Sequence, residues 1–324
     1  MNWQKSWEIR NNGMSNEVKS VHQTVLLNET IEGLNLPKGD SVVIDGTFGG
    51  GGHSLEILKR YSQARIIAID QDKGVFEKAK DKFKGFENRI CFVNDNFRNL
   101  GAEDSKDFCA FALGDIEEGI DGIILDLGLS SDQLENSGRG FSFMRDEPLL
   151  MTMKENPQPE DLTARDVVND WSEKNLADII YGYGEERFAR RIAKGIAEAR
   201  KREKIMTTFD LVGVIEKAVP ASYRKGRLNC ATKTFQAIRI AVNDELNTLK
   251  TGLEKSFDVL KKGGRLSVIS FHSLEDRIVK NFYKEKQKSG EAKLINKKPI
   301  RATEEEIKYN PRSRSAKLRV LEKV

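Results

Sequence analysis

Cysteine is scarce in this 324-residue sequence, and long apolar runs are absent. The three cysteines, Cys91, Cys109 and Cys230, are odd in number and widely spaced. They therefore predict neither a disulfide framework nor a zinc site, which fits a reducing cytoplasm and no bound metal. No apolar run approaches the roughly 18 residues that a membrane span needs. We expect a cytoplasmic protein that makes no membrane contact.

Neither sign of charge dominates the composition. The sequence has 54 basic and 50 acidic residues, for a net charge of +4, so any nucleic-acid site has to be a local basic patch. Residues 1–20 lack the apolar stretch of a secretory signal, and we expect them to form a flexible N-terminal extension. The chain exceeds a typical single domain, so we expect two domains or one domain with an insertion.

The segment from Val42 to Ser54 carries the main functional prediction. An apolar run ends at Asp45, five glycines follow within seven positions from Gly46, and a helical pattern begins at Leu55. This order predicts a strand, a tight loop and a helix. Because glycine permits positive φ and lets a ligand approach the backbone closely, we expect a ligand against the loop.

The acids near this loop favour a ligand without phosphates. The dinucleotide pattern G-x-G-x-x-G fails, because Ser54 stands at its third glycine when the pattern starts at Gly49. Asp45 would repel a pyrophosphate, but it can accept hydrogen bonds from an ammonium group or a loop amide. A second apolar run ends at Asp70, 21 positions after Gly49, where this architecture binds a ribose diol. Alone, Asp70 could also be a turn or helix-capping residue. Together these residues favour a cofactor such as S-adenosylmethionine.

Alternating strand and helix patterns predict an α/β fold with a parallel sheet. Four apolar runs end in polar residues, and the carboxyl ends of parallel strands meet at one edge, so we expect Asp45, Asp70, Asn96 and Asp126 to converge there. From residue 130 the alternation stops, which predicts a helical insertion. The predicted extension covers residues 1–20, and the interrupted sheet domain covers residues 21–133 and 230–324. The inserted helical substrate-recognition domain covers residues 134–229.

Beyond the insertion the sequence predicts one or two helices at 232–260, a turn at 260–265 and a strand at 266–270. The charged segment 284–307 is expected to be a loop or partly ordered, and residues 317–321 are expected to form an edge strand. The helix after the strand at 266–270 is expected to be capped by Ser273 together with Asp276. The sheet is therefore expected to resume after the insertion.

Seven motifs, in order, resemble the RsmH-type (MraW-type) methyltransferases over a region from about His22 to the C-terminus. They are GTFGGGGHS from Gly46, DLGLSS from Asp126, RGFSF from Arg139, YGEERFARRIA from Tyr183, FQAIRIAVNDEL from Phe235, VISFHSLEDRIVK from Val268 and NPRSRSAKLR from Asn310. The resemblance implies a class I Rossmann-like methyltransferase sheet with the inserted helical domain. It also implies S-adenosylmethionine-dependent methylation of the exocyclic amine of a cytidine in the decoding region of small-subunit ribosomal RNA, within the small ribosomal subunit.

The resemblance also implies a set of cofactor contacts, namely Gly51, Gly52, His53, Asp70, Phe97, Asp126 and Gln133. The loop and strand pattern adds Asp45 and Gly49. Loop amides can hold the methionyl carboxylate, Asp70 can accept from both ribose hydroxyls, and Phe97 can pack against the adenine face.

Two residues are candidates for the chemistry. Asp126 is expected to orient the acceptor amine, the cofactor or both, because an acid at the end of the fourth strand can accept an amine hydrogen. His272 is either a partner or proton acceptor for the base, or a histidine that holds the end of its strand. Phe141 and Phe143 are either core residues or a stacking surface for a flipped base.

Two groups of basic residues are expected to contact phosphate, although the first could also be a solvated helix face. They are Arg187, Arg190, Arg191, Lys194, Arg200, Lys201, Arg202 and Lys204 in the insertion, and Arg312, Arg314, Lys317 and Arg319 near the C-terminus.

Three places depart from the family pattern. Thr24 replaces a proline, Lys233 replaces an arginine, and residues 149–154 read Leu-Leu-Met-Thr-Met-Lys where the family reads Leu-Asp-Met-Arg-Met-Asp. The third departure should affect substrate contacts more than cofactor binding. The sequence leaves open a methyltransferase of the same fold that acts on DNA or a small molecule, a non-catalytic RNA-binding assembly factor, and the oligomeric state. A nicotinamide dehydrogenase is disfavoured by Asp45 and the failed glycine pattern.

Overall fold

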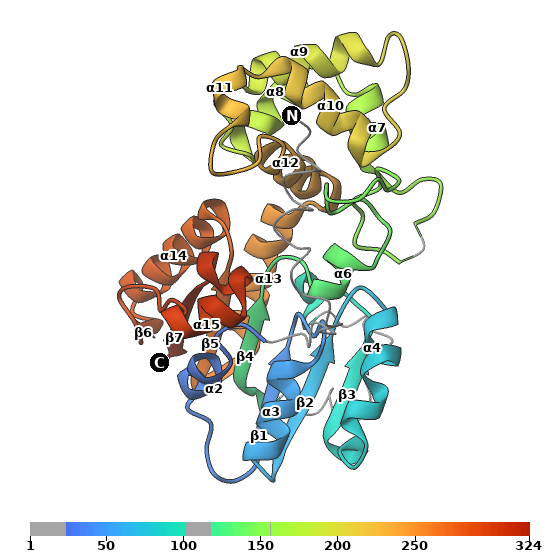
Figure 1. The fold of residues 1–324 in the computed structure, drawn as a ribbon. Coiled ribbons are helices and arrows are strands. Elements are labelled where there is room, and N and C mark those ends of the chain that lie inside the picture. Colours follow the sequence, from blue (N-terminus) through green and yellow to red (C-terminus); the bar gives the residue numbers. More distant parts are fainter. Residues whose placement is uncertain (1–23, 102–117, 156) are drawn as a thin grey trace.

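The computed structural model describes residues 24–101, 118–155 and 157–324, and the predicted N-terminal extension lies outside them. One mixed sheet forms the lower half of the molecule (Figure 1). Its seven described strands are β1 (Ser41–Asp45), β2 (Ala64–Ile69), β3 (Ile90–Val93), β4 (Ile120–Asp126), β5 (Leu260–Ser270), β6 (Ala292–Leu294) and β7 (Lys317–Lys323). The predicted α/β fold with a Rossmann-like sheet is confirmed.

The strand order is β3-β2-β1-β4-β5-β7-β6. The first five strands of this order are parallel, whereas β7 runs antiparallel to both β5 and β6. The chain builds outward from β1 to β3 on one side and then returns to place β4 on the other side of β1. A parallel sheet binds its ligands at the point where the strand order reverses, so the crevice between β1 and β4 is the expected site.

Helices cover both faces of the sheet, because every residue of β1 is buried and each face needs an apolar cover. The helices α2, α3 and α4 share one apolar core with the strands, and α13 and α14 share another. No helix in the described part of the chain is long and apolar enough to cross a membrane. The helices are α2 (Leu27–Leu34), α3 (Gly52–Arg60), α4 (Gly74–Ala79), α6 (Ser131–Glu135), α7 (Ala164–Asp170), α8 (Glu173–Gly182), α9 (Ala189–Ala199), α10 (Thr208–Ala218), α11 (Ala221–Arg224), α12 (Thr232–Asn243), α13 (Glu245–Val259), α14 (Ser273–Lys288) and α15 (Glu304–Tyr309).

The helices α7 to α12 form a separate group above the sheet, with an apolar core of their own (Figure 1). Capping boxes at Thr163 and Thr207 start α7 and α10 by satisfying the first free backbone amides. On α12, Phe235 and Ile238 belong to this core, although the predicted domain boundary lies before them. The boundaries of the insertion stay a prediction.

The predicted region of one or two helices at residues 232–260 is two helices. Asp244 adopts a left-handed conformation, with φ of 48°, between α12 and α13. The bend sends α12 into the core of the insertion and α13 onto the sheet. At this residue the chain passes from the core of the insertion to the sheet.

Three sequence predictions at the C-terminal end are wrong. The turn at 260–265 is a bulge inside β5, where pairing to β4 shifts from Leu260 directly to Arg265. The segment 284–307 is ordered: it contains the last residues of α14, the strand β6 and the start of α15. Finally, β7 is not an edge strand, because β6 pairs along its outer side.

Two smaller corrections concern single residues. His272, rather than Ser273, is the N-cap of α14, and its partner in the capping box is Glu275. The expectation that no disulfide forms is wrong at Cys91, which is disulfide-bonded. Cys230 is a free thiol buried in the core of the insertion.

Two glycines near the end of α8 should respond in opposite ways to alanine. At Gly184 an added Cβ would lie 2.6 Å from the carbonyl oxygens of Ile180 and Lys233, whereas at Gly182 it would meet nothing within 4 Å. We expect Gly184→Ala to lower the free energy of unfolding by about 1–3 kcal/mol, because backbone atoms would have to move. Gly182→Ala, its control, should leave stability unchanged or raise it by about 0.5–1 kcal/mol. Urea denaturation measures both, and equal stabilities would contradict this packing.

Candidate active site

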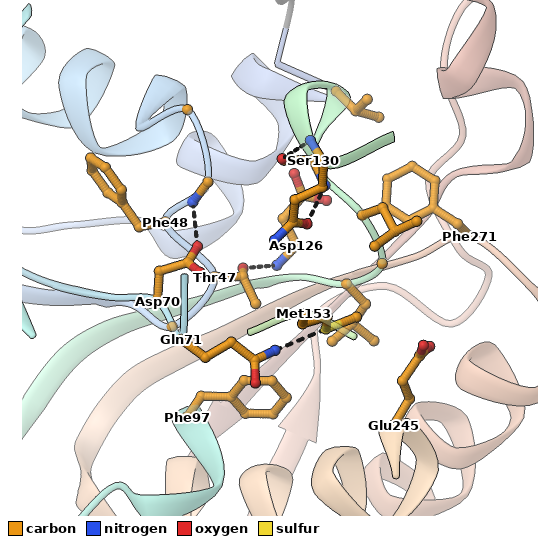
Figure 2. A pocket seen from close by; sticks show the side chains of 18 of the residues that line it. Thr47, Phe48, Asp70, Gln71, Phe97, Asp126, Ser130, Met153, Glu245 and Phe271 are labelled. Atoms are coloured by element: carbon orange, nitrogen blue, oxygen red, sulfur yellow. Dashed lines mark hydrogen bonds between the residues drawn. The ribbon is translucent and has the colours of Figure 1, made fainter. Parts of the chain in front are cut away.

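One open pocket lies at the carboxyl ends of β1, β2 and β4, where the strand order reverses (Figure 2). The empty space inside it, open solvent included, is about 1260 Å³. The predicted convergence is confirmed for Asp70, Asn96 and Asp126, which all line the pocket. Asp45 does not line it.

The glycine loop between β1 and α3 is glycine-rich because it is tightly packed. Gly51 has φ of 70°, and a Cβ on it would lie 2.5 Å from the ring of Phe48. A Cβ on Gly52 would lie 1.7 Å from Oγ1 of Thr24, the residue that replaces the family's proline. Since α3 begins at Gly52, its free backbone amides and its dipole favour a negatively charged group at the loop.

Asp70 follows β2 directly, and backbone amides hold both of its carboxylate oxygens. The N–H of Gly49 donates to Oδ2 at 2.8 Å, and the N–H of Asp72 donates to Oδ1 at 2.9 Å. Burial, with smaller repulsion from Asp72 and Asp45, nevertheless raises the pKa of Asp70 to about 6. The carboxylate is thus fixed in orientation, and its ionised form would gain from further hydrogen-bond donors.

Asp45 stands behind the pocket wall rather than in it. Its side chain is 1% exposed, and it accepts a hydrogen bond from the hydroxyl of Ser54 at 2.6 Å. Burial raises the pKa of Asp45 to about 6 despite this hydrogen bond. Its charge also raises the pKa of Asp70 and of Asp126. A direct cofactor contact by Asp45 stays a prediction.

Asp126 ends β4 and carries an acceptor atom without a donor. Its backbone N–H donates to Oγ1 of Thr47 at 2.6 Å, which ties the strand to the glycine loop (Figure 2). Its Oδ1 is buried and accepts no hydrogen bond from a described residue. Burial, followed by repulsion from Asp45 and Glu275, holds the pKa of Asp126 well above its usual range. A ligand that donates an N–H here would relieve this cost.

The remaining predicted cofactor contacts surround the same pocket. His53, Phe97, Gln133 and the glycines Gly49 and Gly52 line it, whereas Gly51 does not. Phe97 is held against α13, where a Cβ on Gly252 would lie 2.3 Å from its ring. Gln133 is fixed by the capping box of α6, in which its side chain accepts from the N–H of Ser130 at 3.1 Å.

His272 does not line the pocket, and both of its ring nitrogens lie near Glu275, although Nε2 makes no hydrogen bond with a described residue. Nδ1 accepts from the N–H of Glu275 at 3.4 Å, and Nε2 lies 3.1 Å from Oε1 of the same residue. Glu275 does line the pocket and also accepts from the N–H of Phe271 at 2.8 Å. This arrangement favours the structural interpretation of His272, in which it caps α14 and ends β5.

Glu245 and Glu275 are pocket residues that the sequence did not single out. In the view of Figure 2, Asp126 lies between Asp70 on one side and Phe271 on the other, and Glu245 points in from α13. Glu245 binds the guanidinium of Arg239 through two hydrogen bonds of 2.7 Å. Arg239 and Glu245 both belong to the FQAIRIAVNDEL motif, and Glu245 follows the bend after α12. Membership of this motif is the one sequence signal that could have identified the pair.

Glu245, His272 and Glu275 also offer ligand atoms within 4.8 Å of one another, as a metal site would. The guanidinium of Arg239 already supplies a cation to Glu245. Burial alone would lower the pKa of Arg239, but the charge and hydrogen bonds of Glu245 outweigh burial, so this pKa is raised. Glu275 in turn is bonded to the start of α14. The cluster is therefore a buried ion-pair network.

A second cavity adjoins the pocket, and the two share Gln71, Asn96 and Met153 in their linings. Thr152 and Lys154, two of the residues that depart from the family pattern, line only this second cavity. These two departures thus lie beside the predicted cofactor pocket, whereas a third, Thr24, lines the pocket itself.

The two phenylalanines of the RGFSF motif belong to the core of the insertion. Phe141 is 6% exposed, and Phe143 packs edge-on against Phe235 with ring centroids 5.2 Å apart. Neither lines the pocket, which favours the core interpretation.

Comparison with known proteins gives consistent results over nearly the whole chain. The model of the MraW methylase family matches residues 19–324. A Ribosomal RNA small subunit methyltransferase H of Lactobacillus johnsonii is 44% identical over 326 residues, covering 95% of this chain and all of that protein. The protein of the same name from Clostridium botulinum is 46% identical over 319 residues, with coverage of 94% and 99%. A solved rRNA methylase from Streptococcus thermophilus superposes with a TM-score of 0.43 at 11% identity, covering 93% of this chain and 98% of that one.

From the raised pKa of Asp45 we predict how the stability of the protein depends on pH. Because burial raises the pKa of Asp45 from 3.8 to about 6, the folded protein binds this proton more tightly than the unfolded chain does. The contribution of Asp45 to stability is therefore largest below about pH 4 and is lost as the pH rises through about 6. Relative to Asp45→Asn, the wild type should lose on the order of 2–3 kcal/mol between these limits. Urea titrations of both proteins measure the difference, and a constant difference would contradict the shifted pKa.

Proposed function

The chain belongs to the MraW methylase family, and from this premise we propose that it methylates the exocyclic amine of a cytidine in small-subunit ribosomal RNA. It is an S-adenosylmethionine-dependent rRNA methyltransferase, and the name of its relatives supports the small-subunit substrate. The proposal for the chemistry rests on one observation: Oδ1 of Asp126 is buried and accepts no hydrogen bond from a described residue. Asp126 lines the same pocket as the glycine loop and Asp70.

The residues present fit S-adenosylmethionine, which supplies a methyl group on a positively charged sulfur. Asp70, already oriented by two backbone amides, accepts from the ribose hydroxyls. The amides at the start of α3 hold the methionyl carboxylate, and the ring of Phe97 packs against the adenine. The carboxylates of Asp45, Asp70 and Asp126, whose pKa values are all raised by burial, favour a cation among them and disfavour the phosphates of a dinucleotide.

Asp126 is the residue to which we assign the acceptor amine. A cytosine amine is a weak nucleophile because its lone pair is delocalised into the ring, so the enzyme mainly has to position it and accept its proton. An amine N–H that donates to Oδ1 of Asp126 would satisfy the buried oxygen and favour its ionised form, which lowers its raised pKa. His272, whose two nitrogens both face Glu275, acts instead by positioning the start of α14.

The half of the pocket beyond Asp126 is the place for the base. Phe271 offers an apolar face there, and Glu245 and Glu275 offer carboxylate oxygens. Arg312, from the NPRSRS segment, lines the same pocket and pairs with Glu135 at 2.6 Å. A base in duplex RNA would have to be extruded to reach this position, so the target is an unpaired or flipped cytidine.

The outer face of α9 is suited to the RNA backbone. Its basic residues Arg190, Arg191 and Lys194 are exposed, while the opposite face packs into the core of the insertion. Among the described residues, an ion pair is found for Lys194 alone of these three, with Glu198 at 3.8 Å. A row of unneutralised cations is what phosphate binding requires. Through this face the enzyme would contact the backbone of a large RNA, within the small ribosomal subunit, in addition to the target base.

Transfer of labelled methyl groups from S-adenosylmethionine to small ribosomal subunits that lack the modification tests the function directly. We expect nucleoside analysis of the RNA to recover cytidine labelled at its exocyclic amine. Free RNA, DNA of the same sequence and already modified subunits serve as acceptors for comparison. Label on another nucleoside, or cofactor binding without transfer to any of these acceptors, would overturn the proposal.

Replacing Asp126 tests the proposed acceptor of the amine hydrogen. We expect Asp126→Asn to lower turnover by about a hundredfold or more, because the amide is a much weaker proton acceptor of nearly the same shape. Asp132→Asn is the control, since this acid lies on α6 outside the pocket lining and pairs with Lys78 at 2.5 Å. Single-turnover methyl transfer at saturating cofactor measures both. Near-normal turnover of Asp126→Asn with unchanged cofactor affinity would exclude the role.

A further inference from the structure

Arg139 is the first residue of the RGFSF motif, and its side chain is buried. Only 8% of the Arg139 side chain is exposed, and 9% of that of Asp72, its ionic partner. Arginine is almost never buried to this extent without specific partners. What the guanidinium binds therefore indicates what it does.

The guanidinium joins segments that are far apart in the sequence. One terminal nitrogen donates to Oδ2 of Asp72 at 2.8 Å, and the other donates to the carbonyl oxygen of Met153 at 2.8 Å. The side-chain amide of Gln133 approaches the same oxygen of Asp72 at 3.5 Å. Phe141 covers the guanidinium, whose central carbon lies 5.5 Å from the centroid of its ring.

The groups around Arg139 are next to the part of the pocket lining formed by Gln71, Gln133 and Met153, which we call the cofactor wall. Gln71, Gln133 and Met153 line the pocket, whereas Arg139 and Asp72 do not. The N–H of Asp72 donates to Oδ1 of Asp70 at 2.9 Å, and so helps to set the orientation of that carboxylate. One guanidinium thus fixes the loop after β2, the helix α6 and the segment around Met153 from behind.

We propose that Arg139 is a positioning residue of the insertion that holds the ribose side of the cofactor site in its binding geometry. The inference rests on the proposed function, because it takes Asp70 as the ribose contact. The planar fork of arginine bonds a carboxylate and a carbonyl at once in fixed directions, which the single ammonium of lysine does not do. The placement of the insertion and the affinity for the cofactor are therefore linked through this pair.

Isothermal titration of the full-length protein with S-adenosylmethionine tests the link. We expect Arg139→Lys, and likewise Asp72→Asn, to weaken cofactor binding by about tenfold or more, because the wall that presents Asp70 loses its anchor. Turnover at saturating cofactor should stay near the wild-type value, since Asp126 and the base side of the pocket are untouched. The effect is thus a rise in KM for the cofactor without a matching fall in kcat.

Arg265→Lys is the matched control. Arg265 likewise bonds a carboxylate, that of Glu322 at 2.8 Å, and a carbonyl oxygen, that of Gly33 at 3.0 Å, but it does not line the pocket. This variant should lower the melting temperature and leave the cofactor Kd unchanged. If Arg139→Lys does not fold, Asp72→Asn carries the same test.

The possible results separate the inference from the proposed function. Unchanged cofactor affinity in Arg139→Lys or Asp72→Asn, or an equal loss of affinity in Arg265→Lys, would overturn the positioning role while leaving the methyltransferase proposal intact. A wild-type protein that does not bind S-adenosylmethionine would overturn the proposed function, and this inference with it.

Discussion

The site is governed by the cost of burying carboxylates that have too few partners. Asp45, Asp70 and Asp126 lie at the ends of three adjacent strands, and burial raises the pKa of each. Backbone amides and the hydroxyl of Ser54 offset part of this cost but not all of it. A ligand that brings positive charge together with O–H and N–H donors lowers the remaining cost, whereas a ligand with phosphates raises it. The pocket therefore selects a cationic, hydroxyl-bearing cofactor by its electrostatics before any detail of shape.

The insertion completes this pocket instead of only covering it. Asn243, the last residue of α12, accepts from the N–H of Met153 at 2.8 Å and donates to the carbonyl of Met151 at 2.8 Å. Two residues later Glu245 enters the pocket from the start of α13. Because α12 packs in one core and α13 in the other, the bend at Asp244 places substrate-side and cofactor-side groups in a fixed relation. Side chain to backbone bonds of this kind are directional, so they transmit position better than apolar packing alone.

Features that depend on local sequence pattern could be predicted from the sequence, whereas features that depend on long-range contacts could not. The strand ends at Asp45, Asp70 and Asp126 follow from apolar runs, and the glycine loop follows from composition. The segment 284–307 is charged enough to predict a loop, yet pairing of β6 with β7 and the capping of α15 by Thr303 order it. Glu245 and Arg139 were also hidden, since their roles come from partners that only the fold brings near. Spacing along the chain cannot reveal such pairs.

Among the departures from the family pattern, Thr152 and Lys154 lie beside the pocket, whereas Thr24 lines it. The family's Asp, Arg and Asp within this segment carry a net charge of about −1, whereas here Leu150, Thr152 and Lys154 carry about +1. Lys154 pairs with Asp161 beside the second cavity, and Thr152 is buried there. The backbone of the same segment still meets Arg139 and Asn243, through Met153 and Met151. The backbone contacts that build the cofactor wall do not require the family's side chains at these positions, so this edge can vary in charge while the wall is retained.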